Sequence, residues 1–386
     1  MQPFVFNTTA QIIFRAGAAI DLATIMGQRL GSRVLFVTDP GIRRLGLSNP
    51  ALAALSRAGI EAHVFDEVEA DPSLATVLRA VDTARAAGVS GVIGFGGGSS
   101  LDVAKVAALL LGSGEDVEEA WGVGKAKGPR LPLVLVPTTA GTGSEVTPVS
   151  IITIGGAEKR GISSSILLPD VAILDPDLTL GLPPQITAAT GIDAMVHAIE
   201  AYASRNANNN PLSKMLARQA LRMLGANIER AVYDGADRAA RGSMLLGSML
   251  AGQAFANSPV AAVHALAYPI GGGFHIPHGL SNALVLPHVL RFNAPEAASD
   301  YAEIAADVFP DLVGEEEVEA RCAAFIHRLA GLSARVGLPL RLRDVGIEEG
   351  HLPGMARDAM QQARLLVNNP REVTEADAHA IYRAAW

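Results

Sequence analysis

The 386-residue chain has little of what secreted or nucleic-acid-binding proteins usually contain. It has one cysteine, Cys322, which excludes an internal disulfide, and the apolar helical pattern around it favours a buried structural thiol. Basic residues number 31 against 39 acidic ones, and the net charge of −8 argues against a nucleic acid as partner. The first residues lack the basic region and long apolar run of a signal peptide, which predicts a cytoplasmic protein.

Charged residues are missing from 243 to 274, a stretch that resembles a membrane segment in composition. Gln253, Asn257, Ser258 and His264 interrupt it with polar groups, so two buried helices are the better interpretation and no membrane partner is expected. Over the whole chain, hydrophobic residues make up 49% and charged residues 18%. This composition is ordinary for a globular enzyme with a large core.

The first part of the chain alternates short apolar runs with amphipathic segments, which is typical of a parallel sheet with crossover helices. Strands are expected at 33–39, 60–65, 91–96, 133–136 and 171–174. Prolines mark a boundary near residue 182, and the pattern beyond it has helical period. Helices are expected there at 185–204, 212–232, 236–257, 259–269, 282–288, 300–306, 314–336 and 375–385. Because one core rarely supports 386 residues, we expect an α/β domain over 1–182 and an all-helical domain over 183–386.

A glycine-rich turn leads from the strand at 91–96 into a helix that is expected to begin at Ser99 or Ser100. Successive glycines let backbone amides approach an anion, and a helix N-terminus adds free N–H groups and the positive end of its dipole. The turn therefore predicts a phosphate-binding site. The alternative is a turn that only lets the strand and the helix pack together. The candidate cofactor-binding residues here are Gly96, Gly97, Gly98, Ser99 and Asp102.

Asp39 stands at the carboxyl end of the strand expected at 33–39. A carboxylate there can accept hydrogen bonds from a ribose diol and would repel a 2′-phosphate. Asp39 therefore favours NAD over NADP as the cofactor.

A second loop, residues 137–147, carries five hydroxyl side chains and two glycines after the strand at 133–136. Open α/β sheets bind ligands at the carboxyl ends of their strands, so this loop suits a diphosphate or a ribose. A polar surface loop is the alternative. The candidates from this part of the chain are Thr138, Thr139, Thr142, Ser144 and, as a source of positive charge, Lys159.

Asp193 and His197 are four residues apart in an apolar helical pattern, so both side chains leave the same inward face. Such groups are costly to bury unless they are paired or bound, and a divalent metal satisfies both, with a hydrogen-bonded Asp–His pair as the alternative. The segment 264–278 adds three histidines. One carboxylate and up to four imidazoles together favour a metal.

In this order, the motif Gly-Gly-Gly-Ser-x-x-Asp-x-x-Lys, the loop Pro-Thr-Thr-Ala-Gly-Thr-Gly-Ser-Glu and the two histidine segments resemble the iron-containing (group III) alcohol dehydrogenase family. The resemblance covers essentially the whole chain. It implies an N-terminal dinucleotide-binding domain, a helical metal-binding domain, the fold shared with dehydroquinate synthase, and an active site in the cleft between the domains. The metal ligands that it implies are Asp193, His197, His264 and His278. The cofactor contacts that it implies are Asp39, Gly97, Gly98, Ser99, Thr138, Thr139 and Lys159.

The activity that the resemblance implies is NAD-linked interconversion of a small alcohol and its aldehyde or ketone by hydride transfer. Fe²⁺ and Zn²⁺ both accept Asp/His ligation, so residue types alone do not choose the metal. The expected partners are a small-molecule substrate and further copies of the chain, in a homodimer or a larger homo-oligomer.

Three other functions agree less well with the sequence. A maleylacetate-reductase-like or hydroxyacid-oxoacid oxidoreductase would need Arg or Lys beside the substrate carboxylates, and the sequence indicates no such cluster. A lyase or cyclase of the dehydroquinate-synthase type usually binds its metal with Glu and two His, so the Asp193/His197 spacing argues against it. A non-enzymatic binding module would not need a buried metal constellation beside a dinucleotide site.

One position departs from the family pattern. Relatives often carry a second histidine four residues after the third ligand, where this chain has Tyr268. Tyrosine, with an unperturbed pKa of about 10, is a poor base near neutral pH. His275, three residues before His278, is an additional imidazole. We therefore expect His275 to relay the hydroxyl proton and Tyr268 to shape the pocket or to hydrogen-bond the substrate oxygen.

Overall fold

The computed structural model describes residues 2–155, 158–314 and 317–386. The chain divides into two compact units, and each is described by itself. The α/β unit comprises Asn7–Thr139 and Gly143–Leu180, and the helical unit comprises the residues up to Phe6, Ala140–Thr142 and Gly181–Trp386.

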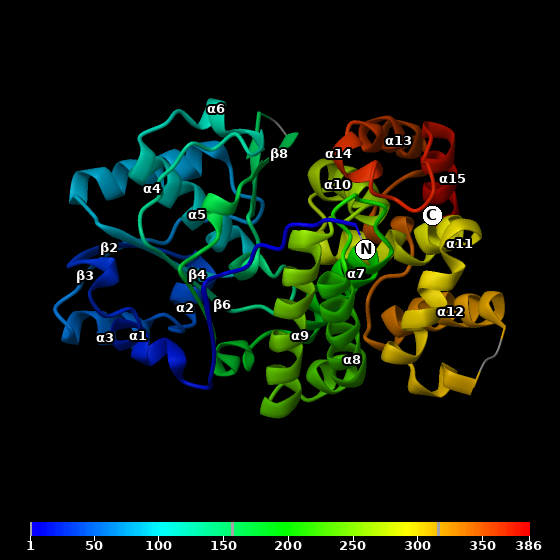
Figure 1. Cartoon of the computed structure of the whole chain (residues 1–386), viewed down its shortest axis with the longest axis horizontal. Coiled ribbons are helices and arrows are strands. Elements are labelled where there is room, and N and C mark those ends of the chain that lie inside the picture. The colour runs from blue at the N-terminus through cyan, green and yellow to red at the C-terminus, as the bar shows by residue number, and fades with distance from the viewer. Residues whose placement is uncertain (1, 156–157, 315–316) are drawn as a thin grey trace. The chain divides into compact units, whose positions relative to one another are not determined.

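A six-stranded sheet forms the centre of the α/β unit (Figure 1). Its order is β1-β9-β6-β4-β2-β3, and each neighbouring pair is parallel. The central strands are buried along their whole length, as expected where helices cover both faces. The strands are β1 (Gln11–Phe14), β2 (Arg33–Val37), β3 (Glu61–Phe65), β4 (Gly91–Gly96), β6 (Leu133–Pro137) and β9 (Val171–Leu174).

Alternate side chains of each strand reach opposite faces of this sheet. Leu35 and Val37 of β2 join a core with helices α4 (Leu74–Ala87) and α5 (Gly98–Ser113). Val34 and Phe36 join a second core with helices on the other face. The remaining helices of the unit are α1 (Leu22–Met26), α2 (Pro40–Arg44), α3 (Asn49–Arg57) and α6 (Val117–Ala120).

A small second sheet of the α/β unit was not expected from the sequence. It consists of β5 (Gly122–Val123), β7 (Val149–Ile154) and β8 (Glu158–Ser163), in the order β5-β8-β7, with β7 and β8 antiparallel. Most of its residues are only half-buried or exposed, and β8 begins with the charged run Glu-Lys-Arg. Strands of this kind lack the buried apolar run that marks the central strands.

The helical unit contains helices and 3-10 turns and no strand among its described residues. The helices that carry candidate site residues, α7, α10 and α11, pack directly on one another or on shared neighbours. The helices are α7 (Pro184–Ala203), α8 (Pro211–Tyr233), α9 (Arg238–Asn257), α10 (Ala262–Phe274), α11 (His278–Val308), α12 (Val318–Arg335), α13 (Leu352–Met360), α14 (Ala363–Leu366) and α15 (Glu375–Ala385).

Several expected boundaries are wrong. The segments expected at 282–288 and 300–306 belong to one helix, α11, which continues through two prolines. Likewise α10 passes Pro269 and ends at Phe274 instead of residue 269. A proline removes one backbone hydrogen bond, but burial of the apolar face of the helix outweighs that loss here. In the other unit, α5 begins at Gly98, slightly earlier than expected.

The expected fold class is confirmed, with a parallel sheet covered by helices followed by an all-helical part. The expected strands and the helix at 375–385 agree with the structure, and Thr374 caps that helix as part of a capping box. Cys322 is buried, as predicted. Within the described residues, no helix is long and apolar enough to cross a membrane.

Candidate functional site

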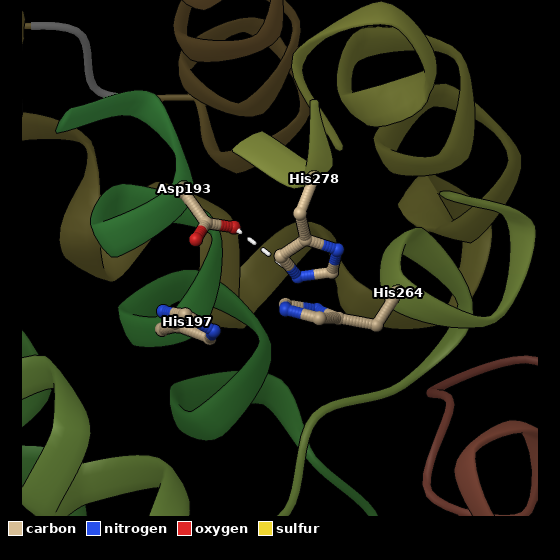
Figure 2. Close-up of side chains that lie close together, drawn as sticks. All are labelled: Asp193, His197, His264 and His278. Atoms are coloured by element: carbon tan, nitrogen blue, oxygen red, sulfur yellow. Dashed lines mark ion pairs between the residues drawn. The ribbon is translucent and has the colours of Figure 1, made fainter. Parts of the chain in front are cut away.

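Four polar side chains of the helical unit converge on one point (Figure 2). Asp193 and His197 leave the same face of α7, His264 lies in the first turn of α10, and His278 is the first residue of α11. One ligand-type atom of each residue lies within 4.8 Å of those of the other three. The structure therefore brings together the four residues that the sequence put forward as metal ligands.

Burial and mutual electrostatics set the charge of this four-residue cluster. Burial raises the pKa of Asp193, but His197, His278, His264 and a hydrogen bond from Asn282 outweigh it, so the pKa lies below its ordinary value. Burial lowers the pKa of His197 to about 3, against the opposing effect of Asp193. At neutral pH the carboxyl group is ionised and this imidazole is neutral, which are the forms that bind a divalent cation.

Asn282 is a fully buried residue beside the four-residue cluster, and the sequence analysis did not identify it. Its Nδ2 donates to Asp193 Oδ1 at 2.6 Å and lies 3.3 Å from Nε2 of both His264 and His278. Its Oδ1 is buried without a hydrogen-bond partner in the described part of the chain. Buried acceptors are normally satisfied, so an unmet one beside four convergent ligand-type groups fits a site that takes up a further group. Asn282 follows His278 by four residues, and this helical spacing was the feature of the sequence that could have placed it on the same face.

Glu200 is a second residue that was missed. Its Oε2 lies 2.6 Å from Nδ1 of His264, and its Oε1 accepts the backbone N–H of Val263 at 2.7 Å. It follows Asp193 by seven residues on α7, so the helical repeat places both on one face. The sequence could therefore have indicated that Glu200 lies near the candidate metal ligands.

Close packing fixes the rings and the helices that carry them. The His197 ring stacks with Phe255, at a centroid distance of 4.3 Å, and with His264, at 4.7 Å. A Cβ atom at Gly279 would lie 2.4 Å from the carbonyl oxygen of Ala189 on α7. Only glycine therefore lets the start of α11 come this close to α7, where His278 lies 3.8 Å from Asp193.

The two residues expected to handle protons lie in different surroundings. Tyr268 is half-buried on α10, and its ring centroid is 6.0 Å from that of His278. His275 is exposed and caps the C-terminus of α10 with a left-handed backbone, at φ 56°. The ring contact with the cluster thus comes from Tyr268.

In the α/β unit, several candidate cofactor residues lie side by side at the carboxyl ends of the strands. Gly97 is the N-cap of α5 and has no side chain to satisfy the first N–H groups of that helix. Asp39 caps α2 through Oδ1, and its Oδ2 would be 3.1 Å from a Cβ atom at Gly96. Thr139 flanks Gly97, since a Cβ atom there would lie 3.8 Å from its hydroxyl. The backbone N–H of Thr138 donates to Gly96 O at 2.9 Å.

Other candidates are engaged within the α/β unit. Asp102 accepts hydrogen bonds from Ser144 Oγ at 2.6 Å and from the Ile151 N–H at 2.9 Å. The buried Lys105, the final residue of the glycine-rich motif, donates to Ser144 Oγ at 2.8 Å. These bonds tie the loop that contains Ser144 to helix α5.

Lys159 and Thr142 lie in other surroundings. Lys159 Nζ lies 2.6 Å from Asp71 and 3.1 Å from Thr153 Oγ1, so part of its charge is neutralised by a local partner. Thr142 lies in the segment Ala140–Thr142, which belongs to the helical unit.

Comparisons with known proteins agree with these features. A sequence profile described as iron-containing alcohol dehydrogenase matches residues 9–176, and one described as Fe-containing alcohol dehydrogenase family, C-terminal, matches residues 187–386. Long-chain-alcohol dehydrogenase 1 of Geobacillus thermodenitrificans is 43% identical over 374 residues, which cover 95% of this chain and 93% of that protein.

Two solved structures are similar over their whole length. The crystal structure of a 1,3-propanediol oxidoreductase has a TM-score of 0.95 and 35% identity and covers 100% of both chains. Sulfoacetaldehyde reductase from Bifidobacterium kashiwanohense, in complex with NAD⁺, has a TM-score of 0.86 and 30% identity, over 100% of this chain and 99% of that one. The resemblance seen in the sequence is confirmed, and the chain belongs to the iron-containing alcohol dehydrogenase family of oxidoreductases.

Proposed function

We propose that the protein is a metal-dependent, NAD-linked alcohol dehydrogenase that interconverts a small alcohol and its aldehyde or ketone. The observation that carries this proposal is the convergence of one ionised carboxylate and three imidazoles in a largely buried cluster. Membership of the iron-containing alcohol dehydrogenase family supports it.

Asp193, His197, His264 and His278 would hold the ion, either Fe²⁺ or Zn²⁺. Such an ion, when bound, acts as a Lewis acid on the oxygen of the alcohol or carbonyl group. The His278 side chain is 39% exposed and Asp193 only 2%, so a small substrate would approach the cluster from the His278 side. Tyr268, which contacts the His278 ring, would then shape the pocket or hydrogen-bond the substrate oxygen.

The α/β unit, within the expected domain 1–182, would bind NAD, which accepts the hydride from the alcohol. The first N–H groups of α5, which no side chain caps, suit the pyrophosphate, and Asp39, whose Oδ1 caps α2, suits a ribose diol through its Oδ2. Residues that are engaged in local bonds, such as Asp102 and Ser144, would hold the binding loops in shape. The proposed cofactor-binding set is Asp39, Gly96, Gly97, Gly98, Ser99, Asp102, Thr138, Thr139, Thr142, Ser144 and Lys159.

We also propose a cytoplasmic homo-oligomer. A single buried thiol suits a reducing compartment, where NAD is available, and closed homo-oligomers are the usual assemblies of such enzymes.

The proposal is tested by replacing His278 with Ala. Loss of one ligand should remove bound metal and abolish NAD-dependent oxidation of a panel of primary alcohols and diols, followed by NADH absorbance. NADH affinity, measured by fluorescence titration, should stay unchanged because no residue of the α/β unit is altered. His327→Ala, an exposed histidine of α12, is the matched control and should keep metal and activity. A metal-free His278→Ala enzyme with near wild-type turnover would show that the metal assignment is wrong.

Replacing Asp39 with Asn tests the choice of cofactor. Asn retains the N-cap of α2 but removes the charge that would repel a 2′-phosphate. The ratio of kcat/KM for NAD to that for NADP should fall by about 5- to 30-fold, which corresponds to roughly 1–2 kcal/mol. Asp82→Asn, on the exposed face of α4, should leave the ratio unchanged. An unchanged ratio in the Asp39 variant would remove this residue from the ribose site.

The proton relay is tested by comparing His275→Asn with Tyr268→Phe. Asn tolerates the left-handed backbone at position 275, so the change removes the imidazole without straining the turn. Because acid–base groups contribute about 10²–10⁴-fold, kcat for alcohol oxidation should fall at least about 10²-fold in the His275 variant and less in the Tyr268 variant. Full kcat in the His275 variant would make this residue a bystander.

A further inference from the structure

Glu200 is a carboxylate with a side chain only 5% exposed, and it contacts the four-residue cluster through His264. Its two oxygens have separate partners. Oε2 lies 2.6 Å from His264 Nδ1, and Oε1 accepts the N–H of Val263 at 2.7 Å. Both bonds link α7 to the first turn of α10, so the position of the carboxylate is fixed by two elements.

The second bond explains how an anion is accommodated in this buried place. Val263 is the second residue of α10, and the N-cap residue Ala261 provides no side-chain hydrogen bond. The first N–H groups of a helix lack partners within it and carry the positive end of its dipole. A carboxylate at this point therefore satisfies a free donor and lies in a favourable field.

The first bond determines which nitrogen of His264 is available. When Nδ1 carries the proton and donates it to Glu200, the lone pair is on Nε2. Nε2 is the atom that lies 3.3 Å from Asn282 Nδ2, on the side of the cluster. A carboxylate on the far nitrogen also raises the basicity of an imidazole ligand and fixes its ring orientation.

Glu200 also changes the charge of the site. Asp193 alone would leave a bound divalent cation with one uncompensated positive charge. Glu200 adds a second carboxylate, buried and separated from the ligand atom by one imidazole ring. The two carboxylates together balance a charge of +2, and this balance is favourable in a buried site.

We infer that Glu200 is a positioning residue for the metal, which sets the tautomer and orientation of His264 and supplies the second balancing charge. This inference rests on the proposed metal-dependent function. The competing role for Glu200 is a purely structural one, in which the carboxylate only caps α10. The two roles differ in their effect on metal affinity and on the His264 tautomer.

The test uses Glu200→Gln, which keeps the size of the side chain and one acceptor oxygen but removes its charge. Dissociation constants of Zn²⁺ and Fe²⁺ are measured by competition with a chelator of known affinity. Metal affinity should fall by about 10- to 100-fold, as for other outer carboxylate partners of ligating histidines. NADH affinity should not change. Glu303→Gln is the matched control, because Glu303 accepts a hydrogen bond from Tyr202 of α7 and contacts none of the four cluster residues.

A wild-type measurement keeps the inference testable if the Gln variant does not fold. Two-bond ¹H–¹⁵N correlation spectra of metal-free protein labelled with ¹⁵N-histidine report which ring nitrogen of His264 is protonated, with His264→Gln for assignment. The inference requires the proton on Nδ1. A proton on Nε2, or a folded Glu200→Gln protein with wild-type metal affinity, would overturn it and leave the proposed function intact. A wild-type protein that binds neither ion would overturn both.

Discussion

Asp193 is an ionised side chain only 2% exposed on a helix surrounded by apolar residues, and such a group costs several kcal/mol unless it is well partnered. Its partners come from three helices. His197 lies one turn later on α7, Asn282 and His278 lie on α11, and His264 comes from α10. The packing of α11 on α7 through Gly279, the stacked rings and the link from Glu200 to α10 all serve to bring these partners together. The packing of α7, α10 and α11 therefore provides partners for one buried charge.

The arrangement suits a cation better than an internally satisfied polar cluster. Three imidazoles around one carboxylate have more acceptor atoms than the single Asn282 amide can satisfy, and the Oδ1 of that amide has no partner in the described residues. A divalent ion would be coordinated by the four ligand atoms together, and the buried carboxylates Asp193 and Glu200 would balance its charge. In the α/β unit, backbone groups would bind the charged part of the cofactor, because the glycine turn exposes the first N–H groups of α5 without a capping side chain.

The sequence predicted those features that depend on local periodicity. Asp193 and His197 share a face because of their spacing, and the parallel strands follow from buried apolar runs. The residues suggested that the histidines of 264–278 join them, but the choice of His264 and His278 as ligands rested on family resemblance, because it depends on how α10 and α11 pack on α7. Glu200 and Asn282 carried a helical spacing signal that gains meaning only once those neighbours are known. The prolines of α11 misled the prediction because tertiary burial outweighs a lost backbone bond.

The central claim is that Asp193, His197, His264 and His278 bind one divalent metal ion. Its most direct test is a crystal structure of the protein loaded with Fe²⁺ or Zn²⁺, with anomalous data collected on both sides of the absorption edge of that metal. The claim predicts one strong anomalous peak at about 2.0–2.2 Å from a carboxylate oxygen of Asp193 and from one nitrogen of each histidine. A metal-loaded crystal with no peak among these four side chains, or with its strongest peak elsewhere, would contradict it.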